Sequence, residues 1–163
     1  MTAIDKAHVL EALRARIADT LGSLTDSQKA TQAGAVHEET RAEDPKDTRA
    51  TEASYLARGL ARRVAELKLG AARLGSLVPM AFGPEDSVAL TALAGLEDED
   101  GGASIVFLVP AGAGETVEVD GQAIRPITPG SPLGKALLGR FPGDEVEVEL
   151  PGGVQLFRIS WIT

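Results

Sequence analysis

Residues 60–74 read LARRVAELKLGAARL, and this stretch decides the first half of the fold. Its apolar positions, Leu60, Val64, Leu67, Ala71 and Leu74, are separated alternately by four and three residues. That heptad spacing is typical of a helix that packs lengthwise against another helix in a coiled coil. Toward the N-terminus the same register continues only through alanines, at positions 57, 53 and 50. The stretch therefore predicts a helix over residues 48–77 whose apolar seam is strongest near its C-terminal end.

The segment before it predicts a partner helix, because no proline occurs between residues 2 and 36. Apolar residues recur at helical spacing along one stripe, at Leu10, Leu13, Ile17, Leu21 and Leu24. Beyond this stripe we expect the seam to continue only through the alanines at 30, 33 and 35. Both seams thin toward the intervening bend, which predicts an antiparallel hairpin. At ~1.5 Å per residue, thirty-odd residues per helix give a rod of roughly 45–50 Å.

The bend carries the densest acidic cluster of the chain. Residues 36–52 read VHEETRAEDPKDTRATE and include six carboxylates, those of Glu38, Glu39, Glu43, Asp44, Asp47 and Glu52. Pro45 suits a bend, since the residue before a proline is pushed out of the helical region. Acidic residues near helix N-termini are common, so a merely solvated loop is one interpretation. The alternative is an acidic tip, over residues 38–52, that acts at the point farthest from any core.

After residue 80 the sequence changes from alanine-rich helix to glycine- and valine-rich β patterns. Alternating stretches at 87–101, 103–110 and 116–127, the last around an Asp-Gly turn, predict strands, and 145–162 predicts a closing hairpin. Ser131 suits the N-cap of a short helix, Pro132 its first turn and Gly139 the position after its end. We therefore expect an α+β protein, with a hairpin in residues 1–79 and an antiparallel sheet with one short helix in 80–163.

The composition excludes several classes of function. The formal net charge is −8 and the pI about 4.8, so binding of nucleic acid across the whole surface is not expected. The sequence contains no cysteine, which excludes disulfides, thiolate metal sites and thiol catalysis. No apolar run approaches the ~18 residues of a membrane-spanning helix. We expect a protein without membrane contact, located in the cytoplasm.

Residues 128–153, TPGSPLGKALLGRFPGDEVEVELPGG, resemble the C-terminal signature of the Gre-type (GreA/GreB) bacterial transcription elongation factors. The shared pattern is a serine-proline pair, an alanine-leucine-leucine-glycine run, a glycine-aspartate pair, an alternating strand and a Pro-Gly-Gly turn. The resemblance implies an N-terminal coiled-coil hairpin followed by an FKBP-like domain. It also implies that this chain is a divergent member of the group.

The resemblance implies a function for the acidic tip. Gre-type factors insert the hairpin through the secondary channel of bacterial RNA polymerase, whose own active site then cleaves backtracked RNA. The tip carboxylates, here Asp44 and Asp47 with Glu43, would act in trans, and Asp44 and Asp47 would share a Mg²⁺ ion with the polymerase. Magnesium prefers oxygen ligands and needs only one or two carboxylates beside waters and phosphates. The chain would bind no cofactor alone and would not itself be an enzyme.

The tip departs from the family pattern, which reads aspartate, leucine, any residue, glutamate, asparagine, then Ala-Glu-Tyr. Here the run is Asp44-Pro45-Lys46-Asp47-Thr48, and a loose counterpart of Ala-Glu-Tyr at 52–55 is displaced by about four residues. Catalytic geometry is sensitive to displacements of about 1 Å. An alternative is therefore a secondary-channel regulator without cleavage activity, either an inhibitor or an initiation regulator of the DksA type.

The resemblance also implies contacts outside the tip. Arg58, Arg62 and Arg63 would contact the 3′ end of the nascent RNA within the polymerase complex, although a solvated helix face is the plainer interpretation. The helix start would dock the C-terminal domain on polymerase through Ser131, Pro132, Leu133 and Gly134. We expect the factor to act as a monomer.

Two functions of other classes remain open from the sequence. The C-terminal domain could be a peptidyl-prolyl isomerase or chaperone, but isomerase activity needs an aromatic-lined pocket. The aromatic residues of this domain are few and scattered, and we expect them to form the core; they are Phe82, Phe107, Phe141, Phe157 and Trp161. The hairpin could also be purely structural, in which case neutralising the acids of the bend would change no polymerase activity.

Overall fold

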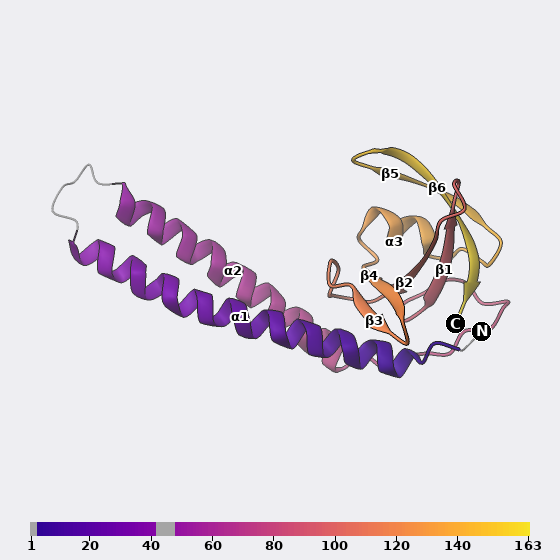
Figure 1. The fold of residues 1–163 in the computed structure, drawn as a ribbon, viewed down its shortest axis with the longest axis horizontal. Coiled ribbons are helices and arrows are strands. Elements are labelled where there is room, and N and C mark those ends of the chain that lie inside the picture. Colours follow the sequence, from indigo (N-terminus) through magenta and orange to yellow (C-terminus); the bar gives the residue numbers. More distant parts are fainter. Residues whose placement is uncertain (1–2, 42–47) are drawn as a thin grey trace.

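The structure, a computed structural model, describes residues 3–41 and 48–163, with side chains for 3–34 and 48–163. Two long helices, α1 (Lys6–Arg41) and α2 (Arg49–Gly75), run side by side and extend from a six-stranded sheet with a short helix (Figure 1). The predicted α+β class, with a helical hairpin before a sheet domain, is confirmed.

The predicted register of the hairpin is confirmed at its base. Val64, Leu67 and Leu74 of α2 are buried, as are the α1 residues Leu10, Leu13 and Ile17. Farther out, the predicted alanine seam of α1 is wrong at Ala30 and Ala33, which are exposed, and the side chain of Ala35 lies outside the described residues. The half-buried described positions after Leu24 are Thr25, Gln28 and Thr31. Steps of four and three from Leu24 lead to Gln28 and Thr31, so helix geometry selects these two although they are polar.

The sheet holds six strands in the order β3-β4-β2-β1-β6-β5. They are β1 (Leu93–Asp98), β2 (Ala103–Leu108), β3 (Val117–Val119), β4 (Gln122–Ile127), β5 (Glu145–Leu150) and β6 (Gly153–Ile162). The prediction of a purely antiparallel sheet is wrong, because β2 and β4 pair in parallel. After β2 the chain crosses to the sheet edge, forms β3 and turns back, so β4 enters beside β2 in the same direction.

Local sequence signals account for the turns and the short helix. Asp120 and Gly121 both have positive φ, at 52° and 73°, as a tight hairpin turn between β3 and β4 requires. Helix α3 (Pro132–Leu137) begins where predicted: the Ser131 hydroxyl accepts a hydrogen bond from the Gly134 N–H at 3.1 Å. Gly139, just after the helix, has a φ of 76°, the left-handed conformation expected there. At α2, by contrast, the Thr48 side chain makes no capping bond.

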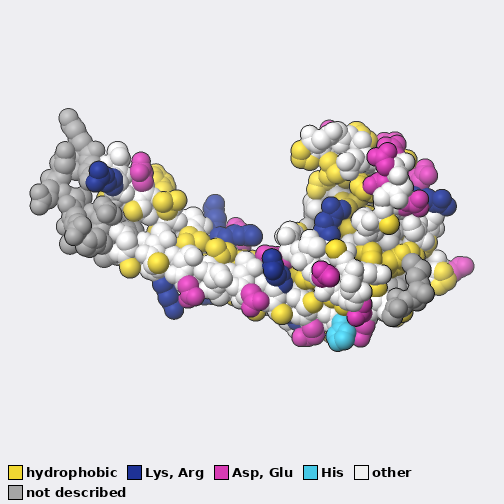
Figure 2. Space-filling view, in the orientation of Figure 1, with side chains coloured by type: hydrophobic (Ala, Val, Ile, Leu, Met, Phe, Trp, Pro, Cys, Tyr) yellow, Lys and Arg dark blue, Asp and Glu magenta, His cyan; other side chains and the backbone are white. Residues whose placement is uncertain are grey.

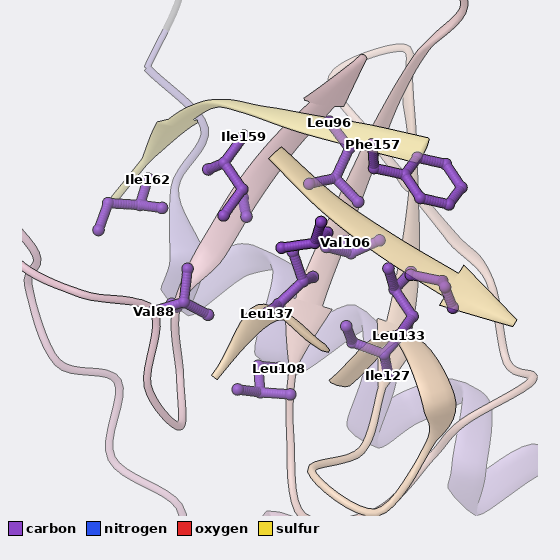
Figure 3. Packing of buried hydrophobic residues seen from close by; sticks show 14 residues of the cluster. Val88, Leu96, Val106, Leu108, Ile127, Leu133, Leu137, Phe157, Ile159 and Ile162 are labelled. Atoms are coloured by element: carbon purple, nitrogen blue, oxygen red, sulfur yellow. The ribbon is translucent and has the colours of Figure 1, made fainter. Parts of the chain in front are cut away.

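The sheet has a separate apolar core on each face. On one face, α3 packs through Leu133 and Leu137 against strand residues such as Val106 and Ile159 (Figure 3). On the other face, the base of the hairpin packs through residues including Leu13 and Leu74 against strand residues that include Phe107. The full second cluster is Val9, Leu10, Leu13, Ile17, Leu67, Leu74, Leu93, Phe107, Val109, Val117 and Ile124. The division into residues 1–79 and 80–163 stays a prediction, and this core draws on both sides of it.

Candidate functional site in the helical hairpin

The predicted tip carboxylates, Glu43, Asp44 and Asp47, lie outside the described residues. The structure does place the helix ends that flank them, at Arg41 and Arg49, at the end of the hairpin away from the sheet (Figure 1). At ~1.5 Å per residue, the 36 residues of α1 span about 54 Å. The described helix ends on either side of residues 42–47 therefore lie at the far end of a long, two-helix-wide rod.

The base of this rod is fixed first by Arg14 on α1. Its Nε donates to the carbonyl oxygen of Leu74 at 2.9 Å, and its Nη2 donates to those of Gly75 and Leu77 at 3.3 and 3.0 Å. The last carbonyls of a helix lack intrahelical partners and carry partial negative charge. Arg14 therefore satisfies the C-terminal end of α2 and holds the two helices in register.

A second contact ties the rod to the sheet domain. Arg16 Nε lies 3.0 Å from Glu115 Oε2, and the Thr20 hydroxyl donates to Glu115 Oε1 at 3.2 Å. Glu115 belongs to the loop between β2 and β3, and its side chain is only 17% exposed. In the same loop, Gly112 has a φ of 94° and lies against Leu13. Polar and apolar contacts together set the direction in which the hairpin leaves the sheet.

A third contact involves Lys6, the first residue of α1. Its Nζ donates to the carbonyl oxygens of Met80 and, at 3.2 Å, of Thr91, and lies 4.6 Å from the centre of the Phe82 ring. Burial lowers the pKa of Lys6 from 10.5 to about 8. The segment between α2 and β1 is thereby fastened to the start of the hairpin.

This burial predicts a pH dependence of stability. Between pH 8 and 10.5 the unfolded chain holds more protons at Lys6 than the folded chain, so the Lys6 contribution to stability rises as pH rises. We expect the free energy of unfolding of the wild type, minus that of Lys6→Met, to be flat below pH 8 and to increase from there toward pH 10.5. Urea denaturation of both proteins across this range measures the difference. A difference that stays constant or falls would contradict the prediction.

The arginines predicted to contact RNA lie on exposed positions of α2. The Arg58 guanidinium lies 5.7 Å from the centre of the Tyr55 ring, and Arg63 lies 3.8 Å from Glu66. Helix α2 is basic within an acidic chain: its cations are Arg49, Arg58, Arg62, Arg63, Lys68 and Arg73, against the two acids Glu52 and Glu66. In Figure 2, Lys and Arg side chains are spaced along the hairpin with Asp and Glu among them, and further Asp and Glu side chains gather at the end of the sheet domain away from the hairpin. The structure thus offers a positive surface along α2, and RNA contact stays a prediction.

The four residues predicted to dock on polymerase form the start of α3. The Ser131 hydroxyl donates to the Thr128 carbonyl at 2.7 Å and also caps the helix, while Leu133 and Gly134 are buried. Of the four, only Pro132 is exposed. Their packing explains why this sequence pattern occurs in the domain, and a docking role would fall to Pro132 and its surface neighbours.

The aromatic residues do not all enter the core, contrary to expectation. Phe107 and Phe157 are buried, but Phe141 is 48% exposed and Phe82 only half-buried. Among the described residues, no group of three His, Asp or Glu side chains could hold a metal ion. The described part of the chain also contains no helix long and apolar enough to span a membrane.

The base contacts of Arg14, Arg16 and Glu115 were not predicted from the sequence. Arg14 follows Leu13 of the buried stripe, which could have marked it as a residue at the edge of the seam. Glu115 lies in a glycine-rich loop, and no local pattern marks it as a contact residue, because its partner Arg16 lies 99 residues away in the sequence.

Comparison with known proteins agrees with the C-terminal resemblance. The family described as "Transcription elongation factor, GreA/GreB, C-term" matches residues 84–163. Transcription elongation factor GreA of Nautilia profundicola is 62% identical over 32 residues, which cover 20% of each chain. GreA of Geobacillus kaustophilus is 42% identical over 64 residues, which cover 36% of this chain and 40% of the relative. The matches thus span less than half the length of these relatives. A solved structure described as the transcription factor Gfh1 is 25% identical over 93% of both chains, with a TM-score of 0.41.

Proposed function

This chain belongs to the Gre-type transcription elongation factors through residues 84–163, which match their C-terminal domain, and on that premise we propose that it binds bacterial RNA polymerase through the secondary channel. The observation that supports this most directly is the hairpin itself. Helix α1 spans about 54 Å and α2 about 40 Å, and where the hairpin leaves the sheet it is only two helices wide, so it can enter a narrow channel that a globular domain cannot. The sheet domain would remain outside and dock near α3.

The tip would act on the catalytic metal of the polymerase. Asp44 and Asp47, with Glu43 beside them, are oxygen donors of the kind that Mg²⁺ prefers. A second Mg²⁺ at the polymerase active site, when bound, stabilises the attacking and leaving oxygens of phosphodiester cleavage. The contribution of this chain is to bring carboxylates to a site that it does not itself contain. It therefore acts as a modulator of an enzyme, with no cofactor of its own.

The base contacts support this function mechanically. Because Arg14 fixes α2 against α1 and Glu115 fixes α1 against the sheet, the position of the sheet domain determines where the far end of the rod lies. Docking of the domain outside the channel would then aim the tip. Along the rod, Arg58, Arg62 and Arg63 present positive charge that suits the phosphates of the nascent RNA 3′ end.

A second version of the function is favoured by the tip sequence. Pro45 stands where the family has leucine, and Asp47, one methylene shorter, stands where it has glutamate. A carboxylate withdrawn by about 1 Å can lose most of its catalytic effect. In this version the chain occupies the channel and regulates polymerase without stimulating cleavage.

The experiment compares the wild type with the double variant Asp44→Asn/Asp47→Asn on backtracked complexes of bacterial RNA polymerase. If the tip serves cleavage, we expect the wild type to accelerate the shortening of the RNA. In the variant this acceleration should fall on the order of 100-fold, while the affinity for polymerase is retained. The matched control is Glu147→Gln/Glu149→Gln on exposed positions of β5, which should behave as wild type. Binding without cleavage by the wild type supports the regulator version, and absence of binding overturns both versions.

A further inference from the structure

A pocket of about 460 Å³ lies between the residues that precede α1 and the face of the sheet that the hairpin covers. It is formed by the two ends of the described chain together with the central strands: Ile4 and Thr163 line it, as do Gly95 and Ile105. The N- and C-terminal ends lie close together at this side of the domain in Figure 1. None of the lining residues belongs to α2 or α3, so the pocket does not include the residues assigned above to polymerase and RNA.

The wall of the pocket contains Trp161, the single tryptophan of the chain. Its indole lies directly against the backbone of Gly95, where an added Cβ would overlap the ring and come within 2.8 Å of Cδ1. Strand β1 therefore needs glycine at this position to let the ring lie flat against the sheet. The result is a planar apolar surface next to Ile105 and Ile4, the arrangement that aromatic and aliphatic ligands favour.

The chemistry of the lining selects the kind of ligand. None of the described side chains that line the pocket is charged, although the chain as a whole carries a net charge of −8. The polar lining residues are Ser104, Gln122, Ser160 and Thr163, which can exchange hydrogen bonds with a neutral group. Pockets that bind small molecules are commonly about 300–1,000 Å³, mostly apolar, with a few polar groups that fix orientation. An ionised ligand would lose its hydration here without gaining a charged side chain as a partner.

We propose that this pocket is a binding site for an uncharged, mainly apolar small molecule with one or two hydrogen-bonding groups. Such a ligand touches the segment that leads into α1 and the sheet at the same time. Its binding free energy therefore stabilises the junction between hairpin and sheet domain, in addition to the contacts of Lys6 and Glu115. The site is independent of the acidic tip, so it stands whether or not the proposed polymerase function does.

The test uses the full chain and the neutral fluorescent probe N-phenyl-1-naphthylamine. We expect saturable binding of one probe per chain, with quenching of Trp161 emission by energy transfer to the probe. Ala103→Asp places a carboxylate at the pocket wall on an exposed strand position and should weaken probe binding by at least about tenfold. Ala123→Asp makes the same change on the neighbouring strand outside the pocket, and should leave the affinity within about twofold of wild type.

Thermal melts of the two variants verify that both are folded and that the probe raises the melting temperature of the wild type. Equal affinity of both variants for the probe would mean attachment elsewhere and would overturn the proposal. Absence of saturable quenching in the wild type would overturn it as well. Probe binding that appears only after removal of residues 1–2 would assign the pocket to the chain's own N-terminus, again against the proposal. If Trp161 emission changed with protein concentration alone and sedimentation showed dimers, the pocket would be assigned to contact with a second copy of the chain, which would also overturn the proposal.

Discussion

Phe107→Ala is expected to lower the free energy of unfolding by about 3–5 kcal/mol, the usual cost of removing a fully buried phenylalanine ring. Phe107 is 0% exposed and lies on β2, opposite Leu93 of β1 and Pro126 of β4. It belongs to the core that also contains Leu13 of α1 and Leu74 of α2. The cavity would therefore open between the sheet and the base of the hairpin, where neither element can close it alone.

Guanidinium denaturation followed by two signals measures this effect. Helix ellipticity reports on α1 and α2, and emission of Trp161 reports on β6. Because the core is shared, we expect both signals to shift together to lower denaturant in Phe107→Ala. Val154→Ala, at a position 64% exposed on β6, is the control and should change stability by less than about 0.5 kcal/mol. Separate transitions for helices and sheet in the wild type would contradict the shared core.

Gly134→Ala is the second large effect, and it arises from overpacking. A Cβ at this position would overlap the carbonyl oxygen of Thr128 and lie 2.8 Å from its carbon and 3.0 Å from Ser131 Oγ. The neighbour is backbone, which cannot turn aside as a flexible side chain can. The Thr128–Ser131 turn and the cap of α3 would have to shift together. We expect a loss of about 3 kcal/mol, at the upper end of the usual range for overpacked sites.

Gly130 provides a matched control for this substitution in the same turn. A Cβ at Gly130 meets no atom within 4 Å, and its φ does not lie in the left-handed region. Gly130→Ala should therefore be neutral or stabilise by up to about 1 kcal/mol, through reduced freedom of the unfolded chain. Thermal unfolding of both variants gives the comparison. If both alanines had the same effect, close packing at Gly134 would not be the reason for glycine there.

The tip, the arginines and the start of α3 were all selected from the sequence. The structure describes the arginines and the start of α3, whereas the tip lies outside the described residues. It explains the serine, leucine and glycine of α3 as a cap, a core residue and a close backbone contact. It places Arg58 and Arg62 on the exposed surface of α2, where contact with a partner is possible. The helix start at Ser131 follows from a local capping pattern, whereas the roles predicted for the arginines and for docking came from the resemblance to Gre-type factors.

Local sequence determined the elements of this protein. The heptads of LARRVAELKLGAARL fixed the buried side of α2, and Asp120-Gly121 and Ser131-Pro132 fixed a turn and a helix start. Each of these signals acts within a few residues, through backbone sterics, capping hydrogen bonds or the helical period.

Only the tertiary structure decided how these elements are joined. Burial of apolar surface has no direction, so a hydrophobic stripe does not specify which surface will cover it. The course of the hairpin depends on Arg16 and Glu115, 99 residues apart, and the parallel pairing of β2 with β4 depends on a crossover to the sheet edge. The pocket beside Trp161 exists because both ends of the described chain meet the sheet at one place. Directional contacts between distant residues form only in the folded chain, and they set the orientation of the hairpin relative to the sheet.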